Sequence, residues 1–242
     1  MSTFTDNFIS DPANHALLQE LLMGPSALRI GEELISHLEI EAGKRVLDLG
    51  CGCGLTTLLL AKEHGAQVFA ADLWISPSEN YERFKKFGID GSTIPVLADA
   101  TKGLPFAHEY FDILLSVDAY HYFGDTPDML PALIPYVKKG GYIAIAIPAL
   151  KQDFGESIPA EMKPWWDNPE IARTIRGIDW WRELWSGTPG IEIVDISEMA
   201  CHKQAWDEWL ASTNPYAVED VPMMQAEGGK YFNTVQLIAK VI

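Results

Sequence analysis

The sequence is short of basic residues. It carries 18 lysines and arginines against 34 aspartates and glutamates in 242 residues, which gives a formal net charge of −16. Proteins that bind nucleic acids or anionic lipid surfaces need clustered basic side chains. We therefore expect neither nucleic acid nor a membrane as a partner. A neutral or cationic small molecule fits this charge better.

Long apolar runs and a secretory leader are also lacking. No stretch approaches the roughly 20 apolar residues that cross a bilayer. The N-terminal sequence MSTFTDNFISDPANHALLQ has no basic start followed by an apolar stretch, as a secretory signal would. The sequence thus predicts a cytoplasmic protein, and it leaves a monomer and a homodimer open.

Cysteine is scarce. Cys51, Cys53 and Cys201 form the odd, low count that is typical of reduced cytosolic thiols. Together with His202 they could in principle surround a soft metal ion, but structural zinc sites show four ligands at recognisable spacings. Nothing in the sequence brings these four residues together, so no metal site is expected.

What the sequence does contain is a regular alternation of strand and helix patterns, without internal repeats. Short apolar runs that end at glycine or a polar residue predict buried parallel strands. We expect strands at 45–50, 67–73, 93–100, 111–119 and 142–147, with helices at 55–64, 77–87 and 125–139. This order predicts an α/β fold in which a doubly wound, mostly parallel, Rossmann-like sheet carries helices on both faces.

The helix at 125–139 is predicted from its two ends. Asp125 before Thr126-Pro127 resembles an N-cap, and Lys138-Lys139 before two glycines suits the negative C-terminal end of a helix. The fifth strand would then begin only at Tyr142.

We expect a single domain over residues 1–242. Its expected parts are an N-terminal helical segment (1–40), a cofactor-binding core (41–150), two helical insertions that cap the sheet (151–187 and 200–230) with a strand between them (191–199), and a closing strand (231–242).

The N-terminal segment is predicted as two helical pieces broken at Met23-Gly24-Pro25, because Gly-Pro is a strong helix breaker. The leucines before this break, at 17, 18, 21 and 22, have the spacing of a face packed on the core. The loop at the break could still touch a bound ligand.

The first insertion is rich in tryptophan. Trp180, Trp181 and Trp185 fit the buried face of an amphipathic helix. Trp165 and Trp166 lie in a proline-flanked stretch and are the better candidates for a substrate pocket. Aromatic walls can bind an apolar ring or, through cation–π contacts, an amine.

The stretch VLDLGCGCG at 46–54 places Gly50, Gly52 and Gly54 directly after the first strand. In doubly wound folds this is where ligands bind. The dinucleotide fingerprint G-x-G-x-x-G would need glycine at Leu55, which weakens the interpretation as an NAD-dependent oxidoreductase. Asp72, at the end of the second strand, could accept hydrogen bonds from both hydroxyls of a ribose.

Four stretches in order resemble the successive motifs of class I S-adenosylmethionine-dependent methyltransferases: VLDLGCGCG, AADLW with Asp72, LADA with Asp99, and FDILLSVDAYHYF. This resemblance covers roughly residues 40–150. VKKGGYIAIAIP and YFNTVQLIAKVI are similar to the family's fifth strand and its last, antiparallel strand. The resemblance implies a seven-stranded sheet and S-adenosylmethionine as the cofactor.

The resemblance also implies roles for individual residues. Asp48, Gly50, Gly52 and Gly54 would surround the amino-acid part of the cofactor, Asp72 would hold the ribose, Leu73 and Trp74 would flank the adenine, Asp99 would receive the adenine amino group with Ala100 beside it, and Ser116 and Asp118 would lie along the methionine.

Methyl transfer from a sulfonium is an in-line displacement, so the protein mainly aligns the reactants and excludes water. A base is needed only where the acceptor is protonated. His121, in DAYHYF beside the expected methyl group, is the candidate base, because histidine titrates near neutral pH. Tyr120 and Asp118 complete the set of catalytic candidates, and Tyr120 and Tyr122 could shape the acceptor pocket. A His121 that only bonds the neighbouring backbone is the alternative.

The sequence therefore predicts an enzyme that transfers a methyl group from S-adenosylmethionine to a small-molecule N, O, S or C nucleophile. The alternatives are a non-catalytic module that binds S-adenosylmethionine or S-adenosylhomocysteine, and an NAD-dependent oxidoreductase. A related branch that transfers a methylene to lipid double bonds usually has a basic membrane-facing surface, which this acidic chain does not predict.

Overall fold

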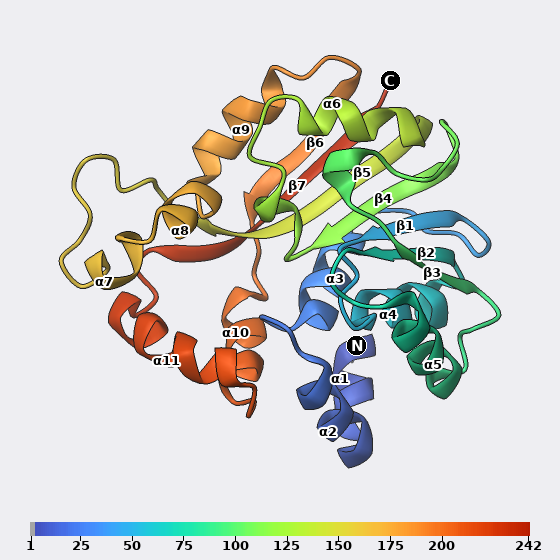
Figure 1. Ribbon diagram of the computed structural model, residues 1–242, viewed down its shortest axis with the longest axis horizontal. Helices are drawn as coiled ribbons and strands as arrows, with labels where there is room; N and C mark the ends of the chain where they lie inside the picture. The colour runs from blue at the N-terminus through green and yellow to red at the C-terminus, as the bar shows by residue number, and fades with distance from the viewer. Residues whose placement is uncertain (1–2) are drawn as a thin grey trace.

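A seven-stranded sheet organises the computed structural model, which describes residues 3–242. The strand order is β3-β2-β1-β4-β5-β7-β6, and only β7, between β5 and β6, runs antiparallel to its neighbours (Figure 1). This confirms the predicted doubly wound, mostly parallel sheet. The strands are β1 (Arg45–Leu49), β2 (Gln67–Asp72), β3 (Thr93–Leu97), β4 (Phe111–Val117), β5 (Val137–Leu150), β6 (Ile191–Glu198) and β7 (Phe232–Val241).

Helices cover both faces of the sheet because side chains alternate along each strand. Val46 of β1 packs with α3 and α4 on one face, whereas Leu47 and Leu49 pack with α6 and α9 on the other. Figure 1 shows these two pairs of helices on opposite sides of the sheet. The helices are α1 (Phe4–Ser10), α2 (Pro12–Leu21), α3 (Ala27–Ile35), α4 (Leu55–His64), α5 (Pro77–Phe87), α6 (Met129–Leu133), α7 (Lys163–Trp166), α8 (Pro169–Thr174), α9 (Ile178–Ser186), α10 (His202–Leu210) and α11 (Pro215–Glu227), with 3₁₀ turns η1 (Ala100–Lys102), η2 (Tyr120–Tyr122) and η3 (Ile134–Tyr136).

Helices α4 and α5 have the bounds that the sequence predicts. Each ends at a glycine in the left-handed conformation, Gly65 (φ 62°) after α4 and Gly88 (φ 65°) after α5. Ser76 caps α5 by accepting a hydrogen bond from the Ser78 amide, and Pro77 follows it at the first helical position.

The predicted helix at 125–139 is wrong. Helix α6 ends at Leu133 and continues only as the short turn η3, because Pro135 has no amide hydrogen and its ring obstructs the preceding turn. Lys138 lies within β5, where its ammonium group pairs with Asp112 of β4 at 2.8 Å. The lysines therefore belong to an irregular stretch at the start of a long strand and cap no helix.

The tryptophans of the first insertion divide into two groups. Trp181 and Trp185 of α9 are fully buried against the sheet, as predicted for an amphipathic helix. Trp166 of α7 is buried in a small cluster with Leu150 and Phe232, and Trp165 packs against that cluster. Both of the latter side chains therefore serve packing beside the ends of β5 and β7.

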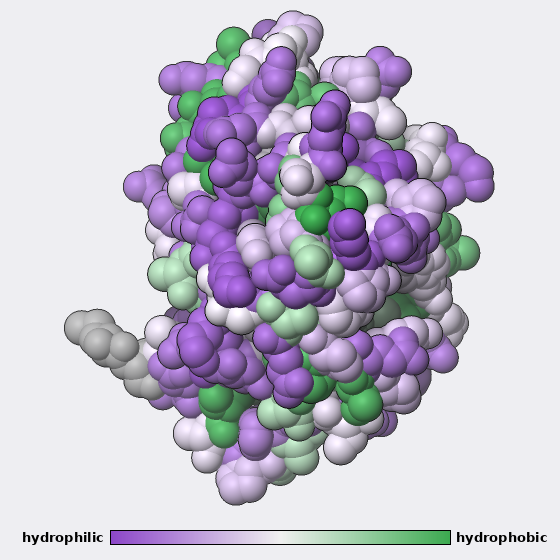
Figure 2. Space-filling model, turned by 90° about the vertical axis from the view of Figure 1, so that its left-hand side faces the viewer, coloured by the Kyte–Doolittle hydropathy of each residue, from purple (hydrophilic) through white to green (hydrophobic). Residues whose placement is uncertain are grey.

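No helix within residues 3–242 is both long and apolar enough to cross a membrane. Figure 2 shows a face that is mostly hydrophilic, with apolar residues in small scattered groups. Scattered groups of this kind are usual on a protein surface.

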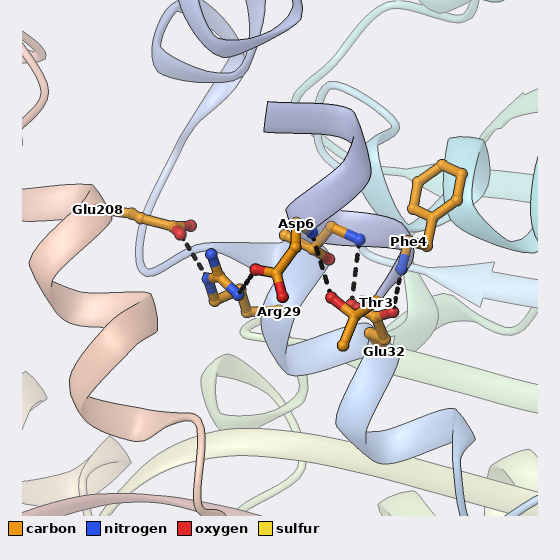
Figure 3. Close-up of polar contacts among 7 residues, drawn as sticks. Thr3, Phe4, Asp6, Arg29, Glu32 and Glu208 are labelled. Atoms are coloured by element: carbon orange, nitrogen blue, oxygen red, sulfur yellow. Dashed lines mark hydrogen bonds and ion pairs between the residues drawn. The ribbon is translucent and has the colours of Figure 1, made fainter. Parts of the chain in front are cut away.

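Polar contacts attach the N-terminal helices to the rest of the fold (Figure 3). The Glu32 carboxylate of α3 accepts hydrogen bonds from the amides of Phe4 (2.6 Å) and Thr5 (3.2 Å) at the start of α1. Arg29, also on α3, donates to Asp6 of α1 at 2.9 Å and to Glu208 of α10. One arginine therefore joins three helices that are far apart in the sequence.

Arg29→Met should lower the free energy of unfolding by about 1–3 kcal/mol, because it leaves the Glu208 carboxylate, only 16% exposed, without its cation. Lys203→Met, which breaks the exposed pair with Asp207 on α10, should change it by less than about 0.5 kcal/mol. Urea unfolding of both variants measures the difference, and equal losses would contradict the role given to Arg29.

Candidate active site

A cavity of about 420 Å³ opens at the carboxyl ends of the central strands. This volume is within the range of small-molecule sites, and the position is where doubly wound sheets bind ligands. Four connections form its walls: the loop after β1, the ends of β2 and β3 with the residues that follow, and the turn after β4. Residues 49–53, 71–74, 98–101 and 117–119 supply these walls.

The glycine loop after β1 adopts a conformation that side chains would disrupt. Gly50, Gly52 and Gly54 all have positive φ angles, of 75°, 52° and 87°. A Cβ on Gly50 would overlap the Cβ of Ala119, and one on Gly54 would overlap the ring of Phe84. Gly50 and Gly52 line the cavity, whereas Gly54 lies outside its lining and allows α4 to approach α5.

Asp48 lies beneath this loop and outside the cavity lining. Its side chain points to the same face of the sheet as α4, where Oδ2 accepts hydrogen bonds from the hydroxyls of Thr56 and Thr57, both at 2.6 Å. Burial raises the pKa of Asp48 to about 6. Asp48 therefore lies under the loop and does not line the cavity, whereas the resemblance implied a contact with the cofactor.

The two cysteines between the glycines both line the cavity. Burial raises the pKa of Cys51 and of Cys53, so both thiols remain protonated near neutral pH. Within residues 3–242, no group of three or more His, Cys, Asp or Glu side chains is arranged to hold a metal ion.

Asp72 connects the loops that follow β1 and β2. Its Oδ2 accepts a hydrogen bond from the Gly52 amide at 2.8 Å, while Oδ1 accepts from the amides of Trp74 (2.7 Å) and Ile75 (2.9 Å). The residue is only 8% exposed but lines the cavity. Leu73 and Trp74 line it as well and remain largely open to solvent, with 51% and 67% exposure.

Asp99 and Ala100 line the cavity beyond Asp72. The Asp99 carboxylate accepts hydrogen bonds from the amide and the hydroxyl of Thr101, at 3.0 and 2.6 Å, and pairs with Lys102 at 2.9 Å. These contacts, those with Thr101 first, hold the pKa of Asp99 at about 2. Asp99 begins the turn η1, which is why β3 ends at Leu97 and not at the predicted Ala100.

The N-terminal segment closes another side of the cavity. Residues 21–25, between α2 and α3, line it directly. The Asn214 side chain donates to the Leu22 carbonyl at 3.1 Å, so α11 also holds this segment. A side chain on Gly24 would overlap the Asp118 carboxylate. The predicted break at Gly24-Pro25 is confirmed, and the buried Leu18 confirms the packing of α2.

Asp118 is the titratable group that the turn after β4 brings to the cavity. It has a φ of 55°, which is uncommon for a residue other than glycine. Burial, followed by the charge of Asp220, raises the pKa of Asp118 to about 7. A carboxylate with this pKa exchanges protons near neutral pH.

Three other predicted residues of this stretch, His121, Tyr120 and Ser116, do not line the cavity. His121 is 3% exposed, lies outside the lining, and has its pKa lowered to about 3 by burial. Tyr120 is buried against Trp181 and Trp185, and Ser116 is buried within β4. The turn η2 buries Tyr120 and His121, whereas Tyr122 and Phe123 reach the cavity.

Phe123 and Glu170 are among the lining residues that were not predicted as site residues in the sequence. Phe123 follows η2, and Glu170 comes from α8 in the first insertion. Trp74 and Tyr122 meet edge to face at the cavity, with ring centroids 5.5 Å apart. The predicted Trp165 and Trp166 do not line it. No sequence pattern distinguishes Glu170 from other surface acids, because only the fold carries α8 to this position.

Comparison with known proteins relates this chain to methyltransferases. Residues 47–145 match the family model described as a methyltransferase domain. The methyltransferase GfsG of Streptomyces halstedii is 28% identical over 202 residues, which are 81% of this chain and 70% of that protein. These matches support a class I S-adenosylmethionine-dependent methyltransferase.

Solved methyltransferase structures share the fold of this domain. Phosphoethanolamine N-methyltransferase 2 of Haemonchus contortus, in complex with S-adenosyl-L-methionine, superposes with a TM-score of 0.74 at 19% identity, over 98% of this chain and 59% of that one. A geranyl diphosphate methyltransferase in complex with the same cofactor superposes with a TM-score of 0.72 at 15% identity, over 100% of this chain and 96% of that one.

The methyltransferase site has features that suit S-adenosylmethionine. The cofactor joins an adenosine to a cationic sulfonium and an amino acid. A backbone cradle without side chains at Gly50 and Gly52 admits close approach, and the amides of a glycine-rich turn suit a carboxylate. The carboxylates of Asp72 and Asp118 on the same cavity suit hydroxyl and cationic groups.

Gly50→Ala should weaken the binding of S-adenosylhomocysteine about tenfold or more, because the new methyl group displaces Ala119 and moves two walls of the cavity. Gly43→Ala is the matched control, since Gly43 has a similar φ of 80° but nothing within 4 Å of an added Cβ. It should cost only the backbone strain of about 1–2 kcal/mol and leave affinity unchanged. Calorimetric titration and thermal unfolding separate the two effects, and equal losses of affinity would refute the steric explanation.

Proposed function

We propose that this chain transfers the methyl group of S-adenosylmethionine to a small-molecule acceptor by in-line displacement. The observation that carries the proposal is one cavity at the carboxyl ends of the strands. The glycine loop, Asp72 and Asp99 line it together with Asp118, Tyr122 and Glu170. A cofactor and an acceptor can therefore meet in a single cavity.

In this proposal the glycine-loop side of the cavity holds the cofactor. The backbone at Gly50 and Gly52 faces its amino-acid portion, and the Asp72 carboxylate accepts from the ribose hydroxyls. Each Asp72 oxygen already holds loop amides, so this carboxylate is fixed in place before a ligand arrives. Trp74 covers the adenine, and Asp99 lies beside the adenine amino group.

The bound cofactor supplies a methyl group that is already activated by the sulfonium. The chain's task is then to align the acceptor and to exclude water. Residues 21–25 and the Trp74–Tyr122 pair cover the cavity from two sides. Where the acceptor must lose a proton, Asp118 is placed to take it, since His121 is buried outside the cavity and neutral above about pH 3.

Binding and turnover test this proposal separately. Calorimetry should detect S-adenosylmethionine and S-adenosylhomocysteine binding but no binding of NAD. Incubation with S-adenosylmethionine and a metabolite extract should release S-adenosylhomocysteine. Binding without release would favour the non-catalytic module, and binding of NAD alone would favour the oxidoreductase.

Trp74→Ala should weaken cofactor binding by about 1–3 kcal/mol, the usual contribution of stacking between a base and an aromatic ring. Thermal stability should hardly change, because Trp74 is 67% exposed. Tyr81→Ala on α5 is the control, since Tyr81 is also exposed, at 43%, but does not line the cavity. If both variants bind S-adenosylhomocysteine like the parent protein, Trp74 does not cover the adenine.

A further inference from the structure

The charges that face the cavity are all of one sign. Asp72, Asp99, Asp118 and Glu170 line it, whereas no lysine, arginine or histidine does so within the part of the chain that the structure describes. Anionic groups such as phosphates are bound by basic side chains or by backbone amides. The lining thus selects against an anionic acceptor.

Two of the four carboxylates already have partners. Asp72 accepts three loop amides, and Asp99 is held by Thr101 and Lys102. Asp118 and Glu170 are different: among residues 3–242, no side-chain hydrogen bond or ion pair reaches either carboxylate. Their charges are therefore free to meet a ligand. Glu170 is exposed on α8, whereas burial raises the pKa of Asp118, and a carboxylate in such a place gains most from a cationic ligand.

Three carboxylates from three distant elements converge around Tyr122. Asp118 follows β4, Glu170 lies on α8 and Asp220 lies on α11. Burial first, and then the charges of these three groups, raise the pKa of Tyr122 to about 12. The tyrosine ring, with Trp74 at its edge, thus lies in a negative environment, and an aromatic face is itself attractive to cations.

We propose that the methyl acceptor is an amine that enters as an ammonium ion and is held against Tyr122 by Asp118 and Glu170. This inference rests on the proposed function and adds to it the chemical class of the acceptor. It also excludes acceptors that carry a phosphate or carboxylate near the reacting atom.

The chemistry of the step balances with Asp118 as the proton acceptor. The ammonium gives a proton to the Asp118 carboxylate, which frees the nitrogen lone pair. That lone pair forms the new nitrogen–carbon bond as the carbon–sulfur bond breaks, and the sulfur keeps the electron pair of the broken bond. Asp118 then releases its proton to water. The products are the methylated ammonium, S-adenosylhomocysteine and one proton.

The two structural neighbours named above provide a contrast, since both are named for phosphorylated acceptors, phosphoethanolamine and geranyl diphosphate. The present cavity offers no basic side chain for such a group. Within the described residues, its acids also form no cluster that could hold a metal ion. A metal ion held in this way could otherwise bridge to a phosphate. The lining of the present cavity therefore does not suit a phosphorylated acceptor.

A fractionated metabolite extract tests the acceptor class before the compound itself is identified. Cation and anion exchange divide the extract into cationic, neutral and anionic pools, and each pool is incubated with the full chain and S-adenosylmethionine, with and without Mg²⁺. Release of S-adenosylhomocysteine should occur with the cationic pool. Release confined to the neutral or anionic pool overturns the amine proposal but leaves methyl transfer standing. No release from any pool overturns both.

Asp118→Asn then tests the residue. With the active cationic pool, kcat/KM should fall about 100-fold or more. In the parent protein kcat/KM should rise between pH 6 and 8, as Asp118 loses its proton near pH 7, and this rise should be absent in the variant. Glu170→Gln should raise KM with a smaller effect on kcat. Glu63→Gln, at an exposed site on α4, is the control and should match the parent.

Folding of the Asp118 variant can be checked independently. Asparagine tolerates the positive φ of this position and removes a charge that burial disfavours. Because the folded-state pKa is raised from 3.8 to about 7, Asp118 lowers stability as the pH rises through this range, and the full cost is present at pH 8. The variant lacks this cost and should unfold at an equal or higher temperature at pH 8. Unchanged S-adenosylhomocysteine binding with unchanged kcat/KM for the cationic pool would remove Asp118 from the mechanism.

Discussion

The Asp72 carboxylate is the contact on which the cavity depends. It holds the Gly52 amide of one loop with one oxygen and the amides of Trp74 and Ile75 with the other. The loops after β1 and β2 are therefore fixed relative to each other, and the wall they form is set before a ligand binds. Charge-assisted hydrogen bonds of this kind are stronger than neutral ones.

A second constraint is steric. The glycine loop passes so close to Ala119 and Phe84 that side chains at Gly50 and Gly54 would overlap them. This close packing brings the turn after β4 against the loop after β1, at the point where the strand order reverses. As a result, the cofactor wall and Asp118 share one cavity.

The cavity is acidic, as is the chain as a whole, which has a formal net charge of −16. Within the described residues, every charged side chain that lines the cavity is an aspartate or a glutamate. Their different surroundings give two of these acids different pKa values. Asp99, held by Thr101 and Lys102, has a pKa of about 2, whereas the pKa of Asp118 is about 7. One carboxylate is then a fixed charge and the other a group that can exchange a proton.

Local patterns predicted much of the fold correctly. The bounds of α4 and α5 follow from their glycines and from the Ser-Pro start of α5, which act within a few residues. The same reasoning failed at 125–139, where Pro135 and the pairing of Lys138 with Asp112 outweighed the capping pattern. Trp165 and Trp166 show a similar limit, since an apolar ring fits a packed cluster as well as a pocket.

The sequence by itself determined the parallel sheet, the glycine loop and the acids at the ends of β2 and β3, because each depends on residues that are close together along the chain. Only the tertiary structure decided which side chains face the cavity. It buried His121 and Tyr120, placed Asp48 under the loop, and brought Glu170 and residues 21–25 to the site. The direction of a side chain in a short turn, and the approach of elements more than a hundred residues apart, depend on packing that no local pattern encodes.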